Sequence, residues 1–88
     1  MKAIVVSEFG GAEQLRLAEA ADPVPGQGQA RVAVHAAGVN PVDAGNRADG
    51  SWAGLTVPFI PGYDIVGVVE SLGPGVRGLT AGDRIMGR

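Results

Sequence analysis

The sequence contains no cysteine, no run of basic residues and no long apolar stretch. Without cysteine the chain can form no disulfide bond, no thiolate zinc site and no thiol nucleophile. The apolar run within the opening MKAIVVSEFG is too short for the core of a signal peptide, because Ser7 and Glu8 interrupt it. No stretch approaches the roughly 20 apolar residues of a membrane helix. We therefore expect a soluble, cytoplasmic protein without a membrane partner.

Charge is low and evenly spread along the chain. Seven lysine and arginine residues stand against nine acidic residues, which gives a net charge of −2. Because no basic stripe is present, nucleic acid is not expected as a partner. With 88 residues and 45% apolar composition, the chain has room for one small folded domain with a modest core. We expect a single domain over residues 1–88.

Glycine and proline are abundant, with 15 and 6 residues among many valines and isoleucines. This composition is typical of short strands separated by tight turns. The expected strands are Lys2–Ser7, Gln14–Ala20, Gln29–Val39, Asp64–Leu72 and a last one beginning at Asp83–Met86. The predicted fold is therefore mainly β, a small, partly open barrel with one short helix.

Alternation in the third expected strand predicts Val32, Val34 and Ala36 on one face, with Arg31, Ala33 and His35 on the other. Gly67, inside the fourth strand, predicts a bulge or a close approach of two backbones. The lone His35 has no second histidine beside it, so we interpret it as an ordinary surface residue.

One helix start is encoded at Asn40. Asparagine is a good N-cap, Pro41 suits the first helical position, and Asp43 in the first turn favours the positive end of the helix dipole. The following residues 49–62 are expected to be irregular, and Trp52 within them to pack against the structure. Asp64, at the start of an apolar strand, is a candidate for a buried polar role.

Residues 73–78 match the pattern G-x-G-x-x-G after a strand. In a dinucleotide site such glycines open a helix whose amides hold the pyrophosphate. The segment that follows, LTAGD, contains glycine and is too short for such a helix. We therefore predict a turn.

Three segments, in this succession along the chain, carry a family resemblance: ARVAVHAAGVNPVD (30–43), VPFIPGYDIVGVVESLGPGV (57–76) and AGDRIMG (81–87). With them the chain resembles the N-terminal, GroES-like domain of the medium-chain dehydrogenase/reductase family. Zinc-dependent relatives carry cysteine, histidine and glutamate at the positions of Asn40, Tyr63 and Asp64. The Asn-Pro-x-Asp form is similar to the zinc-free quinone-oxidoreductase branch.

The resemblance implies hydride transfer from NADPH to a quinone or another electron-poor enone, without a metal. It implies catalytic roles for Asn40, which lines the nicotinamide end of the cleft, and for Asp43, which orients the helix start. It also implies a substrate-binding region in which Trp52 stacks on a flat substrate, Tyr63 fills the vacated metal pocket, and Asp64 lies beside it.

In the family a Rossmann domain follows, and none lies within these 88 residues. We therefore expect a domain that is incomplete at its C-terminus and inactive when isolated. Whether the chain itself should be classed as an enzyme is left open. Its expected partner is a complementing nucleotide-binding half or a second copy that pairs through an exposed strand edge. The alternative is a non-catalytic GroES-like binding or assembly module, for which a large ring-shaped oligomer is the expectation.

Overall fold

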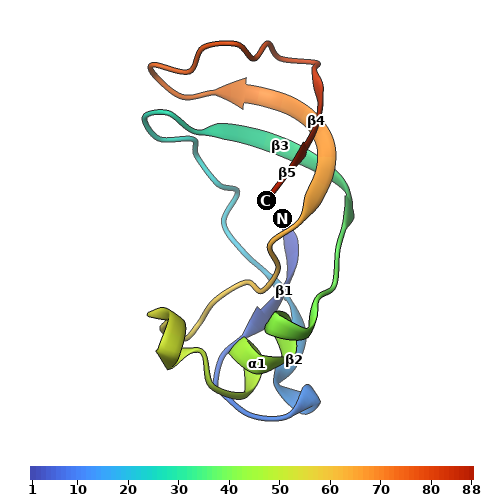
Figure 1. Ribbon diagram of the computed structural model, residues 1–88, viewed down its shortest axis with the longest axis vertical. Coiled ribbons are helices and arrows are strands. Elements are labelled where there is room, and N and C mark those ends of the chain that lie inside the picture. Colours follow the sequence, from blue (N-terminus) through green and yellow to red (C-terminus); the bar gives the residue numbers. More distant parts are fainter. The chain divides into compact units, whose positions relative to one another are not determined.

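The computed structural model describes all 88 residues and is mainly β with one α-helix (Figure 1). The chain divides into two compact units. We call Met1–Ala21 with Val39–Gly62 the helical unit, and Asp22–Gly38 with Tyr63–Arg88 the sheet unit. The elements in chain order are β1 (Lys2–Val6), η1 (Ala12–Gln14), β2 (Leu15–Glu19), β3 (Ala30–Ala37), α1 (Pro41–Asp49), η2 (Ser51–Ala53), β4 (Ile65–Leu72) and β5 (Arg84–Gly87).

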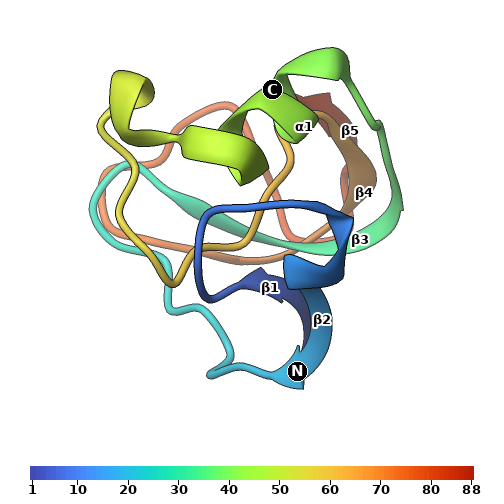
Figure 2. The same cartoon turned by 90° about the horizontal axis from the view of Figure 1, so that it is seen from below.

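In the helical unit, β1 and β2 form an antiparallel pair (Figure 2). Val6, at the end of β1, exchanges two backbone hydrogen bonds with Phe59, at 2.9 and 3.1 Å. Its side chain is fully buried. The ring of Phe59 in turn lies 6.1 Å from that of Phe9, in a tilted arrangement that is favourable for aromatic pairs. These apolar side chains form the centre of this unit.

Helix α1 begins where the sequence predicts. Asn40 is the N-cap, with extended backbone angles, and Pro41 is the first helical residue. The backbone N–H of Asn40 donates to Oδ2 of Asp43 at 2.9 Å, which is half of a capping box. The helix extends to Asp49 and is followed by the buried Gly50.

The sheet unit is a three-stranded antiparallel sheet with the order β3-β4-β5 (Figure 1). Val69, on the central strand, is buried. Gly67 is buried too, and a Cβ at this position would overlap the carbonyl oxygen of Ala33 and lie 2.8 Å from Cγ1 of Val32. The close backbone approach predicted at Gly67 is therefore confirmed, because no side chain fits between the strands there.

Two β-bulges interrupt the β3–β4 ladder. The register passes from Arg31↔Ser71 to Val32↔Val69, which leaves Glu70 without an opposite residue. It then passes from Val34↔Gly67 to Ala36↔Val66, which leaves His35 without one. Such an extra residue shifts the side-chain alternation that follows it.

The predicted alternation of β3 is consequently wrong at its end. Val32 and Val34 do share a face, because they lie opposite Val69 and Gly67. Ala36 lies opposite Val66, and therefore on the other face. His35 is exposed, as predicted.

The glycine-rich segment 73–78 forms the connection between β4 and β5 and opens no helix, so the predicted turn is confirmed. Gly75 and Gly78 adopt φ of 79° and 82°, values that favour glycine. Gly73 donates its N–H to the Gln29 carbonyl at 2.7 Å, and the Pro74 carbonyl accepts from Gly28 at 2.8 Å. These bonds hold two turns together at one end of the sheet.

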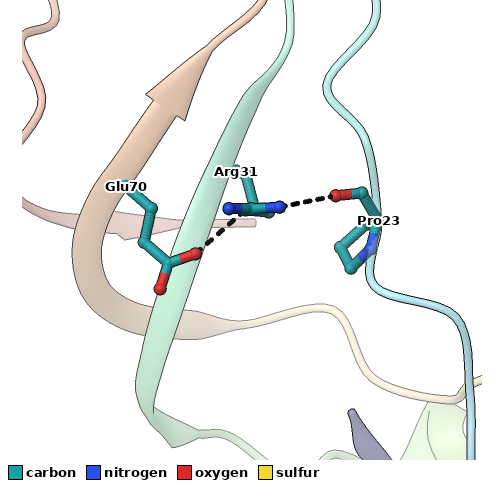
Figure 3. A network of polar contacts seen from close by, with 3 residues as sticks. All are labelled: Pro23, Arg31 and Glu70. Atoms are coloured by element: carbon teal, nitrogen blue, oxygen red, sulfur yellow. Dashed lines mark hydrogen bonds and ion pairs between the residues drawn. The ribbon is translucent and has the colours of Figure 1, made fainter.

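Arg31 fastens the proline-rich loop before β3 to the same sheet (Figure 3). Its Nε donates to Oε2 of Glu70 at 2.9 Å, and its guanidinium also donates to the Pro23 carbonyl at 3.4 Å. Glu70 is the bulge residue of β4, so the irregularity in the ladder is where its carboxylate meets the arginine.

Candidate functional site

The polar cluster at the start of α1 contains the residues with the strongest functional expectation. Asn40 and Asp43 are both half-buried, and the N–H to carboxylate bond between them fixes their relative position. The second carboxylate oxygen of Asp43, Oδ1, is buried and has no hydrogen-bond partner. A buried acceptor without a donor is costly, so a bound group that brings an N–H or O–H to it would be stabilised.

Two further polar residues lie near the end of α1, and the sequence did not single them out. Arg47 donates from Nε to the Gly10 carbonyl at 3.1 Å, while its own carbonyl accepts the Gly10 N–H at 2.9 Å. Asn46 is only 2% exposed. The spacing of four residues from Asp43 to Arg47 was an available signal, because such residues share a helix face. No sequence signal marked Asn46 as buried.

Trp52 lies in the short 3₁₀ helix η2, where the sequence predicted an irregular segment. The helix ends at Gly54, whose φ of 75° favours glycine. The indole is 68% exposed, so the expectation that Trp52 packs inside the structure is wrong. An exposed indole offers a flat surface on which an aromatic ligand can stack.

Just before η2, the side chain of Asp49 accepts the Ser51 backbone N–H at 3.0 Å. Hydrogen bonds from the Ser51 side chain and backbone, in that order of importance, lower the pKa of Asp49 below its ordinary 3.8. The carboxylate therefore acts locally, fixing the turn that leads into Trp52.

The sheet unit carries the remaining two expected site residues, Tyr63 and Asp64. The Tyr63 side chain is 40% exposed and that of Asp64 is 39% exposed. Asp64 forms an ion pair with Arg88, at 3.5 Å between Oδ1 and Nε, and its carbonyl accepts the Gly38 N–H at 2.9 Å. The expectation that Asp64 is buried is therefore wrong, and its carboxylate is accessible.

A hollow of about 700 Å³ lies beside Asp64 in the sheet unit. Its walls are the end of β3 with Gly38, the start of β4 with Asp64, and residues 86–88. Apart from Asp64 and Arg88, the side chains around it are apolar. This composition suits an apolar group with one polar contact.

No group of three histidine, cysteine, aspartate or glutamate side chains is placed where it could hold a metal ion. The helices of the structure include none that is both long and apolar enough to span a membrane.

The chain is similar to several known proteins. The chain is 42% identical over 86 residues to quinone oxidoreductase of Rattus norvegicus, which covers 97% of this chain and 26% of the rat protein. It is 38% identical to the human synaptic vesicle membrane protein VAT-1 homolog-like, with a TM-score of 0.92 over 98% of this chain and 28% of that structure. A mycobacterial protein complexed with NADPH is 37% identical, with a TM-score of 0.89 over 98% of this chain and 27% of that structure.

The chain thus spans about a quarter of the length of these relatives. Residues 26–88, most of the chain, match the family described as the alcohol dehydrogenase GroES-like domain. The mainly β fold with one helix agrees with this match, as the sequence predicted. The chain therefore belongs to the alcohol dehydrogenase GroES-like domain family.

Proposed function

We propose that the chain is the substrate-side domain of an NADPH-dependent, zinc-independent oxidoreductase that reduces quinones or related enones. The observation that carries this proposal is the similarity to quinone oxidoreductase across 97% of the chain. Because the chain spans only 26% of the rat protein, we assign the activity to an assembly that also contains a nucleotide-binding half. Alone, residues 1–88, taken as one GroES-like domain, are expected to be inactive.

The residues present fit only one end of NADPH. The glycines of segment 73–78 lead into β5 and open no helix, so they offer no pyrophosphate site of the usual kind. At the start of α1, by contrast, Oδ1 of Asp43 is a buried acceptor without a donor. The amide of a nicotinamide ring could supply such a donor. We therefore assign the nicotinamide end to this chain and the phosphates to the partner half.

Asn40 and Asp43 carry the proposed chemistry. NADPH supplies the hydride when it is bound. The Asn40 side chain would donate a hydrogen bond to the substrate oxygen and stabilise the negative charge that develops there. Asp43 acts as a positioning residue, because its Oδ2 holds the Asn40 backbone N–H at 2.9 Å. Without the Lewis acidity of zinc, the substrate must already be electrophilic.

Substrate binding is proposed for three further residues. The exposed indole of Trp52 would stack on a flat substrate, as its 68% exposure permits. For Tyr63 and Asp64, in the sheet unit, the support for a substrate-binding role is that both side chains are accessible. For partners, we propose the small-molecule substrate and the nucleotide-binding half, in the cytoplasm, and neither nucleic acid nor a membrane.

The first experiment measures NADPH binding by the 88-residue chain, through quenching or enhancement of fluorescence, and quinone reduction by the same sample. We expect neither saturable binding at micromolar NADPH nor turnover. Tight binding or turnover by the chain alone would contradict the proposed division of the site. The mass in solution, measured in parallel, tests the alternative of an assembly module, because a ring predicts a large, discrete oligomer.

The second experiment replaces the matching residues of the rat quinone oxidoreductase with this chain. We expect the chimera to reduce quinones with NADPH, and Asn40→Asp to lower kcat/KM about a hundredfold, as for other lost donors to a developing oxyanion. Aspartate caps a helix as well as asparagine but donates no hydrogen bond, so the variant should keep its thermal stability. An active Asn40→Asp chimera would rule out the donor role.

A further inference from the structure

Gly50 is the residue around which the connection from α1 to η2 is built. Its carbonyl accepts two backbone N–H groups, from Ala53 at 3.0 Å and from Leu55 at 3.1 Å. Its φ of −88° suits any residue. A Cβ at this position, however, would lie 3.0 Å from the Asn46 carbonyl oxygen and 3.0 Å from Cδ1 of Leu55. The space around its α-carbon therefore favours glycine here, although the backbone angle does not require it.

A glycine at this position leaves the residue before it with little protection. An aspartate carboxyl carbon can be attacked by the backbone nitrogen of the next residue, and a side chain on that next residue hinders the attack. Asp49, the last residue of α1, is followed by Gly50, which has no side chain. The other aspartates of the chain precede proline, alanine, isoleucine or arginine. Asp49 is therefore the aspartate with the least steric hindrance to this reaction.

The reaction needs no reactant besides the chain and water. The Gly50 nitrogen bonds to Cγ of Asp49, its proton leaves with the carboxyl hydroxyl as water, and a succinimide ring closes. Water then opens the ring at either of its carbonyl carbons. Opening at Cγ restores aspartate, whereas opening at the main-chain carbonyl carbon leaves Gly50 bonded to Cγ, which is isoaspartate. The water lost in the first step is regained in the second, and nothing is oxidised or reduced.

Two features of the fold oppose this reaction. Residues through Asp49 are ordered by α1, so the attack requires that the last helical turn frays, as helix ends do. Ser51 also holds the Asp49 carboxylate, because its backbone N–H donates to Oδ1 at 3.0 Å. The Ser51 hydroxyl and this N–H lower the pKa of Asp49, so less of the protonated carboxyl, the form that loses water, is present. The carboxylate is thus bound to Ser51 instead of being free to react with Gly50.

We propose that Asp49–Gly50 is a site of spontaneous isomerisation to isoaspartate, and that Ser51 limits its rate by holding the Asp49 carboxylate. In the product the original carboxylate becomes part of the main chain, which gains one carbon between α1 and η2. The ionised acceptor of the Ser51 N–H is then lost, and the turn that leads into Trp52 changes its shape. Because the reaction takes place between adjacent residues, it needs no bound partner. It is also independent of the proposed redox function, since it uses neither Asn40 nor the cofactor.

The test keeps the 88-residue chain in neutral buffer at body temperature for several weeks and locates isoaspartate in its proteolytic peptides by mass spectrometry. Isoaspartate is expected to accumulate at position 49 faster than at Asp43, which precedes alanine. Asp22 is the internal blank, because the following Pro23 has no N–H. Trp52 is the only tryptophan, so its fluorescence should change in step with the isoaspartate content.

Substitutions separate the reaction from its control by Ser51. Ser51→Ala should raise the rate about threefold, as expected when one exposed hydrogen bond is lost. The matched control is Ser7→Ala, at an exposed serine of the same unit, which should leave the rate unchanged. In Asp49→Asn the side-chain amide releases ammonia and needs no protonated carboxyl, so this variant should react faster than the original chain.

The proposed site is refuted by isoaspartate at position 49 that is no more abundant than at Asp43, or by an Asp49→Asn variant that stays intact over the same weeks. The role of Ser51 is refuted by equal rates in Ser51→Ala and Ser7→Ala. Accumulation at position 49 that Ser51→Ala accelerates and Ser7→Ala does not, with a parallel change in Trp52 fluorescence, would support the proposal.

Discussion

The helical unit and the sheet unit are stabilised in opposite ways. In the helical unit, particular side chains make particular contacts: Asp43 caps α1, Arg47 holds Gly10, and Phe9 packs near Phe59. In the sheet unit, two decisive positions are those where no side chain is tolerated. A Cβ at Gly67 or at Gly73 would overlap backbone carbonyl oxygens of the neighbouring segments.

This difference affects what each unit can do. A sheet that depends on close backbone approach leaves little freedom to vary its interior, so its variable chemistry lies at the edges and the loops. A helix start that depends on side chains can be altered one residue at a time. The candidate reactive residues Asn40 and Asp43 lie at such a start.

The largest expected effect comes from adding one methyl group to the sheet. Gly67→Ala and Gly73→Ala should each lower the free energy of unfolding by about 3 kcal/mol or more, because backbone atoms must move to accommodate the Cβ. The control is Gly87→Ala in the same sheet, where no atom lies within 4 Å of the added Cβ. Urea denaturation of the three variants compares them, and equal stabilities would refute the role assigned to close approach.

A smaller effect is expected when a side chain is removed from the helical unit. Arg47→Ala loses the hydrogen bond to the Gly10 carbonyl and should cost about 1 kcal/mol. Arg16→Ala, an exposed arginine of β2 in the same unit, is the matched control and should cost almost nothing. Thermal melts would measure both, and equal melting temperatures would show that the Arg47 contact contributes little to the unit.

A third substitution tests whether glycine behaves differently in the two units. Gly45 lies inside α1, is exposed, and has no atom within 4 Å of an added Cβ. Gly45→Ala should therefore stabilise the chain by about 0.5–1 kcal/mol, through the better helix propensity of alanine. The same change at Gly54, with φ of 75°, should instead destabilise it. A destabilising Gly45→Ala would remove the contrast with Gly67.

Much of this arrangement could be predicted from local sequence. The start of α1 was predicted at the correct residue, because Asn40, Pro41 and Asp43 each act within one turn. The strands were predicted to within one or two residues for the same reason, since apolar β-branched runs end at glycine and proline. The family resemblance, confirmed by the match over residues 26–88, depends on motifs that are equally local.

The remaining features depend on contacts between distant segments. The bulge at His35 arises from pairing with β4, about thirty residues away, so the alternation within β3 could not reveal that Ala36 changes face. The burial of Asn46 and the Arg47–Gly10 bond likewise need the turn after β1. Proximity to an apolar strand suggested that Asp64 is buried, but Arg88 pairs with it at an accessible position.

The smallest expected effect is confined to one carboxylate of the helical unit, Asp49. Its pKa is lowered below 3.8 by the hydrogen bonds of Ser51, first from the side chain and then from the backbone. A lowered pKa in the folded state means that ionised Asp49 favours folding at pH values above 3.8. That contribution is lost as the pH falls from 3.8 through the lowered value.

Ser51→Ala removes the side-chain bond and leaves the backbone N–H in place, so it should raise the pKa of Asp49 only part of the way toward 3.8. An NMR titration of the Asp49 carboxyl carbon in the original chain and in the Ser51→Ala variant measures this directly. Because Asp49 is fully exposed to solvent, the melting temperature should hardly depend on the substitution. An unchanged Asp49 titration would show that the Ser51 hydroxyl does not hold the carboxylate, and the turn before Trp52 would then depend on backbone geometry, as the turns of the sheet unit do.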